Sequence, residues 1–128
     1  MSTPRTIQGW LDFMAAGDPQ VLHDLLDDEV TFYSPAMFTP QIGREKSAAY
    51  LLAAEKMLSS NNFRYVDEWY ADESAILHFT VEIGGVQIEG IDMIHWNDRD
   101  KITRFAVMIR PLKGLQTVIA AMGELLSR

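Results

Sequence analysis

The second half of the chain consists of four β-rich runs separated by short turns, and this pattern restricts the fold more than any other feature of the sequence. The second and third runs flank Gly84-Gly85, a dipeptide typical of two-residue hairpin turns. Strands joined by such short turns pair as antiparallel neighbours. The four expected strands are FRYVDEWYA, SAILHFTVEI, VQIEGIDMIHW and ITRFAVMI. The sequence therefore predicts an antiparallel sheet in this half of the chain.

The first half of the chain has helical spacing instead. A first helix is expected to end at Gly17, and Asp18 and Pro19 begin a second helix as its N-cap acceptor and first residue. VTFYSP is expected to form a short strand closed by its proline, and REKSAAYLLAAEKML is rich in helix-forming residues. The apolar positions that define the first two helices are Ile7, Trp10, Leu11, Met14, Leu22, Leu25 and Leu26.

A closing helix is expected after the last strand. Pro111 breaks that strand, and the residues after it carry an apolar stripe at helical spacing. The stripe consists of Leu112, Leu115, Val118, Ile119, Met122 and Leu126. N-terminal helices packed on a curved, mainly antiparallel sheet define an α+β fold, here a cone-shaped α+β barrel that can leave a cavity. A chain of 128 residues without a linker or repeat predicts one domain over residues 1–128.

The charge and composition of the chain argue against several classes of function. A net charge of −7 opposes binding to nucleic acid, whose phosphates require a basic face. The chain has no cysteine, and no apolar run approaches the roughly 20 residues of a membrane span. No metal-ligand or phosphate-binding motif occurs, so neither a metal nor another cofactor is expected. We expect a cytoplasmic protein without a nucleic-acid or membrane partner.

The register of the central hairpin decides which face of the sheet carries Asp92. If Gly84-Gly85 closes a two-residue turn, Leu77 faces Asp92, and Asp92 is the only ionisable group on an otherwise apolar face. A bulge at Gly90 would reverse the faces. We favour the unshifted register because it keeps apolar residues such as Trp96 inside.

This apolar face is expected to line a cavity that the first helix covers. If the NDRD loop pairs Trp96 with Lys101, Asp92 lies opposite Phe105. The predicted ligand-binding residues are Trp10 and Met14 from the first helix, Leu77, Phe79, Val81, Ile88, Phe105, Val107 and Ile109 from the sheet, and Phe32, Ser34 and Phe38 at the mouth.

Asp92 has two interpretations at this point. Isolated buried acids are costly and tend to mark functional sites, which favours a catalytic acid or a polar anchor for a ligand. Burial would then raise the pKa of the Asp92 carboxyl group, because a low dielectric disfavours the charged form. The alternative is a structural carboxylate whose hydrogen bonds come from Trp10, from a tyrosine or from a backbone N–H.

Three stretches of the chain resemble the nuclear-transport-factor-2-like superfamily, and within it the ketosteroid isomerases and the SnoaL-like polyketide cyclases. These stretches are GWLDFMAAGDPQVLHDLLDDEVTFYSP, the GRE that opens a helix, and GIDMIHWNDRDKI at the end of the hairpin. The resemblance covers almost the whole chain and implies the cone-shaped fold. It does not choose an activity, because the superfamily includes isomerases, cyclases, dehydratases, epoxide hydrolases and proteins that only bind or assemble.

The resemblance implies an acid without its usual base. In ketosteroid isomerases an aspartate at the place of Asp92 stays protonated in an apolar site and donates a hydrogen bond to the developing oxyanion. The second donor of those enzymes is a tyrosine on the first helix, where this chain has Trp10. Their catalytic base is an aspartate before the proline that ends the first strand, where this chain has Ser34. A neutral serine cannot take a carbon-bound proton unaided.

Two functions follow from these observations. The first is an isomerase, lyase or cyclase that acts on a small, largely apolar molecule bearing a carbonyl or hydroxyl, with Asp92 as acid or hydrogen-bond donor. The second is a non-catalytic ligand-binding or dimeric assembly domain. The outer face of the sheet is too apolar for open water, which predicts a homodimer packed through the sheet, as the resemblance also implies. The apolar residues of that face are Trp69, Ile76, Ile91 and Met93.

Overall fold

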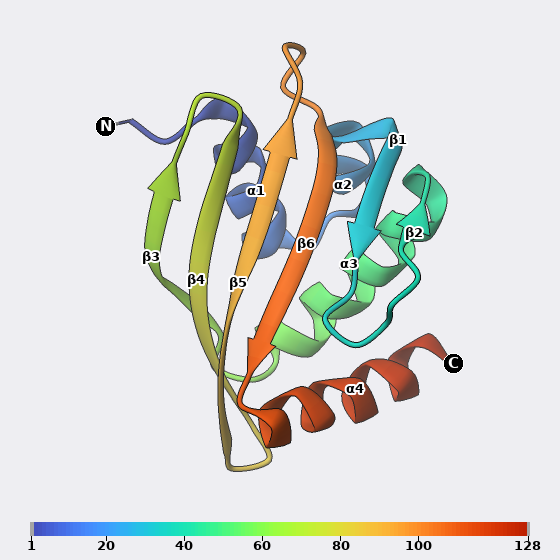
Figure 1. The fold of residues 1–128 in the computed structure, drawn as a ribbon, viewed down its shortest axis with the longest axis vertical. Coiled ribbons are helices and arrows are strands. Elements are labelled where there is room, and N and C mark those ends of the chain that lie inside the picture. Colours follow the sequence, from blue (N-terminus) through green and yellow to red (C-terminus); the bar gives the residue numbers. More distant parts are fainter. Residues whose placement is uncertain (1, 128) are drawn as a thin grey trace.

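The computed structural model describes residues 2–127, and these form four helices and one six-stranded sheet (Figure 1). The elements in chain order are α1 (Arg5–Ala16), α2 (Pro19–Leu25), β1 (Leu26–Tyr33), β2 (Gln41–Ile42), α3 (Arg44–Ser59), β3 (Arg64–Tyr70), β4 (Ser74–Ile83), β5 (Val86–Trp96), β6 (Ile102–Arg110) and α4 (Leu112–Leu126). The predicted α+β class is confirmed. The two-residue strand β2 and the early start of β1 were not predicted.

The sheet is mixed and open. Its strand order is β2-β1-β6-β5-β4-β3, and β1 pairs with β6 in parallel while the other neighbours are antiparallel. Figure 1 shows α1, α2 and α3 behind the sheet and α4 across its lower end, where α4 contacts β5, β6 and α3. One face of the sheet is therefore covered by helices, and the other face carries none among the described residues.

The two short N-terminal helices meet as their capping residues predict. Gly17 ends α1 in the left-handed conformation, with a φ of 69°, and its N–H donates to the carbonyl of Phe13. The Asp18 side chain accepts the N–H of Gln20 at 2.9 Å, and Pro19 is the first residue of α2. This tight link holds α1 against α2.

The central hairpin has the predicted register. Gly84 and Gly85 have φ values of 56° and 80°, which suit a two-residue turn, and Leu77 pairs with Asp92. Gly90 pairs regularly and is no bulge. A Cβ at Gly90 would lie 2.5 Å from the carbonyl oxygen of Met108 and 2.6 Å from Cζ of Phe79. The glycine therefore makes room for the ring of Phe79, which crosses the strand beside it.

The predicted pairing of β5 with β6 is wrong in detail. Asp92 pairs with Val107 instead of Phe105, and Trp96 pairs with Ile102 instead of Lys101. The Asn97 side chain is the cause, because its Oδ1 accepts the N–H groups of Arg99 at 3.0 Å and Lys101 at 3.1 Å and so extends the loop.

A register shift between His95 and Trp96 adds one more residue to the offset. The total displacement is even, so the faces are preserved. Phe105 is buried on the helix-covered side as predicted.

The core consists of two apolar clusters on the helix-covered side of the sheet. The first joins α1, α2 and β1 to the sheet through residues such as Phe13, Leu22 and Phe105. The second joins α3 and α4 to the hairpin through residues such as Met57 and Val118. Side chains of both clusters leave a space between them, and this space is the cavity described next.

Candidate functional site

A cavity of about 280 Å³ lies between the helices and the concave face of the sheet. Its wall comes from α1, from the segment after β1, from α3, from the sheet and from α4. Of the predicted ligand-binding positions and the predicted acid, it is lined by Trp10, Met14, Phe32, Ser34, Phe79, Asp92, Phe105, Val107 and Ile109. The structure thus brings together one acid and a largely apolar set of side chains drawn from distant parts of the chain.

Four predicted residues lie elsewhere. Leu77, Val81 and Ile88 are almost fully buried in the core and do not reach the cavity. Ile88 is separated from it because α4 packs directly on this part of the sheet, where a Cβ at Gly114 would lie 3.0 Å from the Ile88 side chain. Phe38 does not close the mouth, because its side chain is fully exposed to solvent, at 102% of the reference area.

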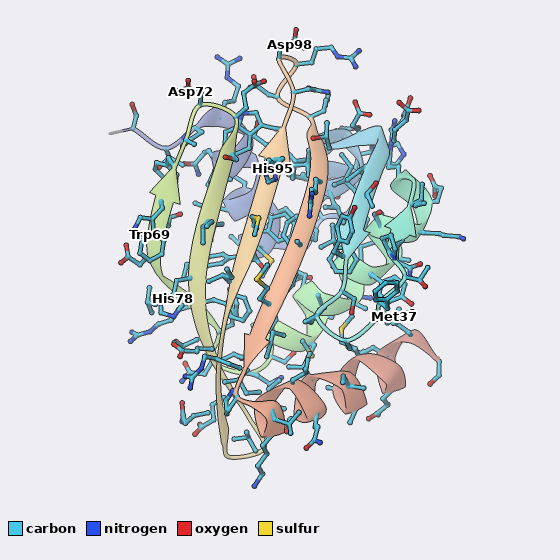
Figure 2. The ribbon with its side chains drawn as sticks, viewed as in Figure 1. Met37, Trp69, Asp72, His78, His95 and Asp98 are labelled. Carbon is cyan, nitrogen blue, oxygen red and sulfur yellow. The ribbon has the colours of Figure 1, made fainter. Side chains whose placement is uncertain are left out.

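The α3 and α4 sides of the cavity were not predicted. An apolar stripe was predicted for α4, whereas α3 was predicted only from its helix-forming residues. Which side of either helix faces a cavity depends on how the helix packs, and the sequence does not show this. The mouth also includes Met37, which Figure 2 shows in the connection between β1 and β2. The main unpredicted lining residues from the two helices are Tyr50, Leu51, Ala54, Met57, Leu58, Val118, Ile119 and Met122.

Asp92 is the buried acid of this site, with 5% of its surface exposed. The hydroxyl group of Tyr65 donates a hydrogen bond to Asp92 Oδ2. The indole Nε1–H of Trp10 donates to the Tyr65 oxygen at 2.8 Å. Because an indole nitrogen can only donate, the three groups form a chain that runs from Trp10 through Tyr65 to Asp92.

The pKa values of Asp92 and Tyr65 both favour the protonated forms of these side chains. Burial raises the pKa of Asp92 from 3.8 to about 7, although the hydrogen bond from Tyr65 acts in the opposite direction. Burial and the neighbouring Asp92 raise the pKa of Tyr65 well above its usual value, so the phenol keeps its proton. Asp92 can therefore be a neutral acid near neutral pH.

The sequence interpretation missed Tyr65, and a bulge in β3 is the reason. Tyr65 pairs with Phe79 but Asp67 pairs with His78, so Val66 is an extra residue between them. Strict alternation would place Tyr65 and Trp69 on the same face. The bulge turns Tyr65 toward the cavity side and leaves Trp69 on the outer face. The tyrosine named as one structural alternative for Asp92 was thus present in the sequence, but its face could not be read from it.

The other polar groups at the cavity do not form a second centre beside Asp92. Ser34 accepts the N–H of Ala36 at 3.2 Å and has no carboxylate partner. Glu55 lines the cavity, but its carboxylate accepts a hydrogen bond from Ser59 on the same helix and lies against Gly17 at the end of α1. Among residues 2–127, the cavity therefore has one buried acid, Asp92, and no base beside it.

The histidines lie away from the cavity. His78 is 2.9 Å from Glu89 on the outer face of the sheet, and His23 lies beside Arg44. Within residues 2–127 no group of three or more histidine or carboxylate side chains could hold a metal ion. None of the helices described is both long and apolar enough to traverse a bilayer.

A curved sheet packed around helices, with an apolar cavity between them, is the architecture of the nuclear-transport-factor-2-like α+β fold. The sequence matches the SnoaL-like domain over residues 7–105, so the chain belongs to the SnoaL-like domain family. No curated protein sequence matches the chain.

Solved structures agree with this assignment. A steroid delta-isomerase from Pseudomonas aeruginosa is 30% identical, with a TM-score of 0.90 over 95% of this chain and 89% of that chain. A protein with a cystatin-like fold from Silicibacter pomeroyi DSS-3 is 28% identical, with a TM-score of 0.86 over 94% and 84% of the two chains. A protein described as a SnoaL-like polyketide cyclase, from Jannaschia sp. CCS1, is 8% identical with a TM-score of 0.71 over 95% and 96%, and shares the fold alone.

Proposed function

We propose that this SnoaL-like domain binds one small, largely apolar molecule bearing a carbonyl or hydroxyl oxygen, and that Asp92 forms the hydrogen bond that orients it. The observation that carries this proposal is a single buried acid in an apolar cavity. A polar group placed in this way fixes the orientation of a ligand whose remaining surface is held by apolar contact.

If the domain is catalytic, we propose chemistry of the isomerase, lyase or cyclase type with Asp92 as acid or hydrogen-bond donor. The 30% identity to a steroid delta-isomerase supports this direction. Ser34 argues against an identical reaction, because it occupies the position where ketosteroid isomerases have their catalytic base and it has no carboxylate. The reaction favoured by this arrangement is one in which polarising a carbonyl group is the main requirement.

Binding can be tested without knowledge of the natural ligand. Bicyclic ketones titrated into labelled protein should shift the amide NMR signals of residues around the cavity, including Phe79 and Val107. Asp92→Leu should weaken the binding of the ketone more than the binding of a hydrocarbon of the same shape. Ketone binding that is unchanged in Asp92→Leu would remove Asp92 from the proposal.

We also propose that the domain forms a homodimer through the helix-free face of the sheet. This face carries a patch of apolar side chains bordered by the ion pairs of Glu89 with His78 and Arg110. Figure 2 labels Trp69, His78 and His95, which the strand pairing places on this face. The apolar patch consists of Trp69, Ile76, Ile91, Met93 and Met108.

The size of the helix-free face supports this second proposal. Five strands of about ten residues, at about 3.3 Å per residue and about 4.8 Å between strands, cover roughly 800 Å². A stable dimer buries about that area on each partner. Trp69 and Met108 are about half exposed in the single chain, at 54% and 48%, so both have apolar area that a partner at this face would cover.

A further inference from the structure

We propose that Tyr65 and Trp10 are positioning residues that fix which oxygen of Asp92 carries its proton, and that the cavity therefore selects ligands with one acceptor oxygen over ligands of the same shape that offer only a donor. This inference rests on the proposed function, ligand binding beside Asp92. It adds a direction to that hydrogen bond and names the ligand class: neutral, compact, apolar molecules with a single carbonyl oxygen.

The direction of the hydrogen bond between Tyr65 and Asp92 follows from the number of hydrogens that each of the three linked side chains can donate. Trp10 Nε1 has one hydrogen and no acceptor capacity, so the Tyr65 oxygen must accept it at 2.8 Å. The Tyr65 hydroxyl then has its own single hydrogen to place. Among residues 2–127 its only acceptor is Asp92 Oδ2. If Oδ2 carried the proton and donated to Tyr65, the hydroxyl hydrogen would have no acceptor inside the protein, which is costly for a buried group.

Asp92 Oδ2 is therefore an acceptor, and the proton of the neutral acid lies on Oδ1. Oδ1 has no hydrogen-bond partner among the described residues. It is also not one of the enclosed unpaired polar atoms, which are Thr6 Oγ1, Glu68 Oε1 and His95 Nδ1. Because Asp92 lines the cavity, the accessible Oδ1 faces the space where a ligand would lie. An O–H group in that position donates.

The other two donors of this hydrogen-bond chain, on Trp10 and Tyr65, are already paired within it. The Trp10 N–H and the Tyr65 O–H both point along the chain and are satisfied within it, so Oδ1–H is the donor of this chain that is left for a ligand. A ketone oxygen placed at Oδ1 completes the chain with every hydrogen paired. A ligand that offers only an N–H would face another N–H or O–H donor there and leave a buried polar group unsatisfied.

Three bicyclic probes of similar shape separate these cases: indane, which has no polar group, 1-indanone, which accepts, and indoline, whose N–H mainly donates. Their dissociation constants should be measured by NMR titration at about pH 5.5, below the pKa of about 7 of Asp92. We expect 1-indanone to bind about three- to tenfold more tightly than indoline, the range that one added hydrogen bond supplies. Indane should bind more weakly than 1-indanone.

Tyr65→Phe tests the positioning role. Without the hydroxyl group, Oδ2 is free to carry the proton and Oδ1 can accept, so the preference for 1-indanone over indoline should fall to below about twofold while indane affinity stays the same. Trp10→Phe should also reduce the preference, because the Tyr65 hydroxyl then loses the N–H that orients it and can turn away from Oδ2 into the space that the indole leaves. Trp10→Phe therefore also tests the positioning role if Tyr65→Phe does not fold. Tyr70→Phe is the matched control, since Tyr70 is on the same strand and its hydroxyl is in no hydrogen bond that the structure describes.

The outcomes distinguish this inference from the proposed function. A preference for indoline, or equal binding of all three probes in the unmodified protein, would overturn the inference and leave cavity binding intact. A preference that persists unchanged in both Tyr65→Phe and Trp10→Phe would overturn the positioning role. Failure of all three probes to bind at millimolar concentration would overturn the proposed function itself.

Discussion

The hydroxyl group of Tyr65 donates a hydrogen bond to Asp92 across a strand that contributes neither residue. Tyr65 is on β3 and Asp92 on β5, with β4 between them. Tyr65 pairs with Phe79, and Phe79 pairs with Gly90, two residues before Asp92, so the tyrosine reaches over β4 along a diagonal. The contact therefore depends on the registers of three strands at once.

The stability of the protein should fall as the pH rises from about 5 to about 8. The pKa of Asp92 is about 7 in the folded chain against 3.8 for a free side chain, so the folded state holds the proton to a higher pH than the unfolded state. Unfolding in this window releases a proton and becomes easier with rising pH. Between about pH 5 and about pH 8 the loss is about 2–3 kcal/mol, at roughly 1.4 kcal/mol per pKa unit, because the unfolded-state group has already lost most of its protons at pH 5.

Asp92→Asn removes this titration and keeps an acceptor for Tyr65. Urea unfolding should be measured at about pH 5 and about pH 8. Relative to the unmodified protein, the free energy of unfolding of the variant should be higher by a few kcal/mol at about pH 8 than at about pH 5. Asp72→Asn, an exposed change in the turn between β3 and β4, should follow the unmodified protein at both pH values. A difference for Asp92→Asn that does not change with pH would mean that Asp92 is ionised throughout.

Gly90→Ala should destabilise the fold although alanine is only one methyl group larger. Its Cβ would meet the backbone oxygen of Met108 at 2.5 Å, and the strand cannot move away without breaking its pairing. We expect a loss of about 1–3 kcal/mol in the free energy of unfolding. Gly123→Ala in α4 is the control, because nothing lies within 4 Å of its Cβ and alanine favours helices by about 1 kcal/mol. Equal stabilities of the two variants would contradict the close approach at Gly90.

Ser34→Asp should supply the base that the cavity lacks. With a carboxylate at the mouth and Asp92 as donor, the variant should isomerise a bicyclic β,γ-unsaturated ketone to its conjugated form, followed by the absorbance of the enone. We expect at least about a hundredfold gain over the unmodified protein, the lower range for a positioned general base. The double variant Ser34→Asp with Asp92→Leu should lose most of the gain. A rate that is the same with and without Asp92 would show that the two acids do not act on one ligand.

Met108→Glu should convert the proposed homodimer into a monomer. Met108 is 48% exposed in the single chain and pairs with Ile91 on the helix-free face, so the charge disturbs an interface more than the fold. Light scattering at micromolar concentration measures the mass directly. Leu112→Glu, at a 70% exposed position on α4, should leave the dimer intact. A monomeric mass for the unmodified protein would end the dimer proposal.

Phe38→Ala should leave the free energy of unfolding within about 0.5 kcal/mol, because a fully exposed ring has no packing to lose. Phe105→Ala should cost about 3–5 kcal/mol, because Phe105 is fully buried and packs on Trp10 with the ring centres 4.7 Å apart. Thermal unfolding of both variants makes the comparison. A large loss for Phe38→Ala would show that its ring is packed in solution.

The parts of the fold that local sequence determines could be predicted. The Gly84-Gly85 turn sets the pairing of β4 with β5 residue by residue, and this placed Asp92 on the covered face. The caps at Gly17 and Asp18 likewise act within a few residues. Each of these signals is carried by the backbone conformation of one or two residues, so no distant contact is needed to interpret it.

The remaining features depend on contacts that the sequence does not display. The bulge at Val66 and the extra residue in the β5–β6 pairing shift side chains by one position, and no glycine or proline marks either place. Because of the bulge, strict alternation does not predict that Tyr65 faces Asp92, its hydrogen-bond partner. The parallel pairing of β1 with β6 joins segments at opposite ends of the chain, and the cavity walls from α3 and α4 follow from helix packing.

The parallel pairing of β1 with β6 also constrains how the chain folds. β3 to β6 can form early as a meander of local hairpins, but Phe32 meets Phe105 only after most of the chain has closed into a loop. Closing this loop reduces the conformational entropy of the chain before the contact between the two strands can stabilise it, and this slows folding. Because these two rings form part of the cavity wall, we expect the binding site to be completed late in folding. A ligand that fits this cavity will therefore bind the finished fold and not a partly folded chain, and it should slow unfolding more than it speeds folding.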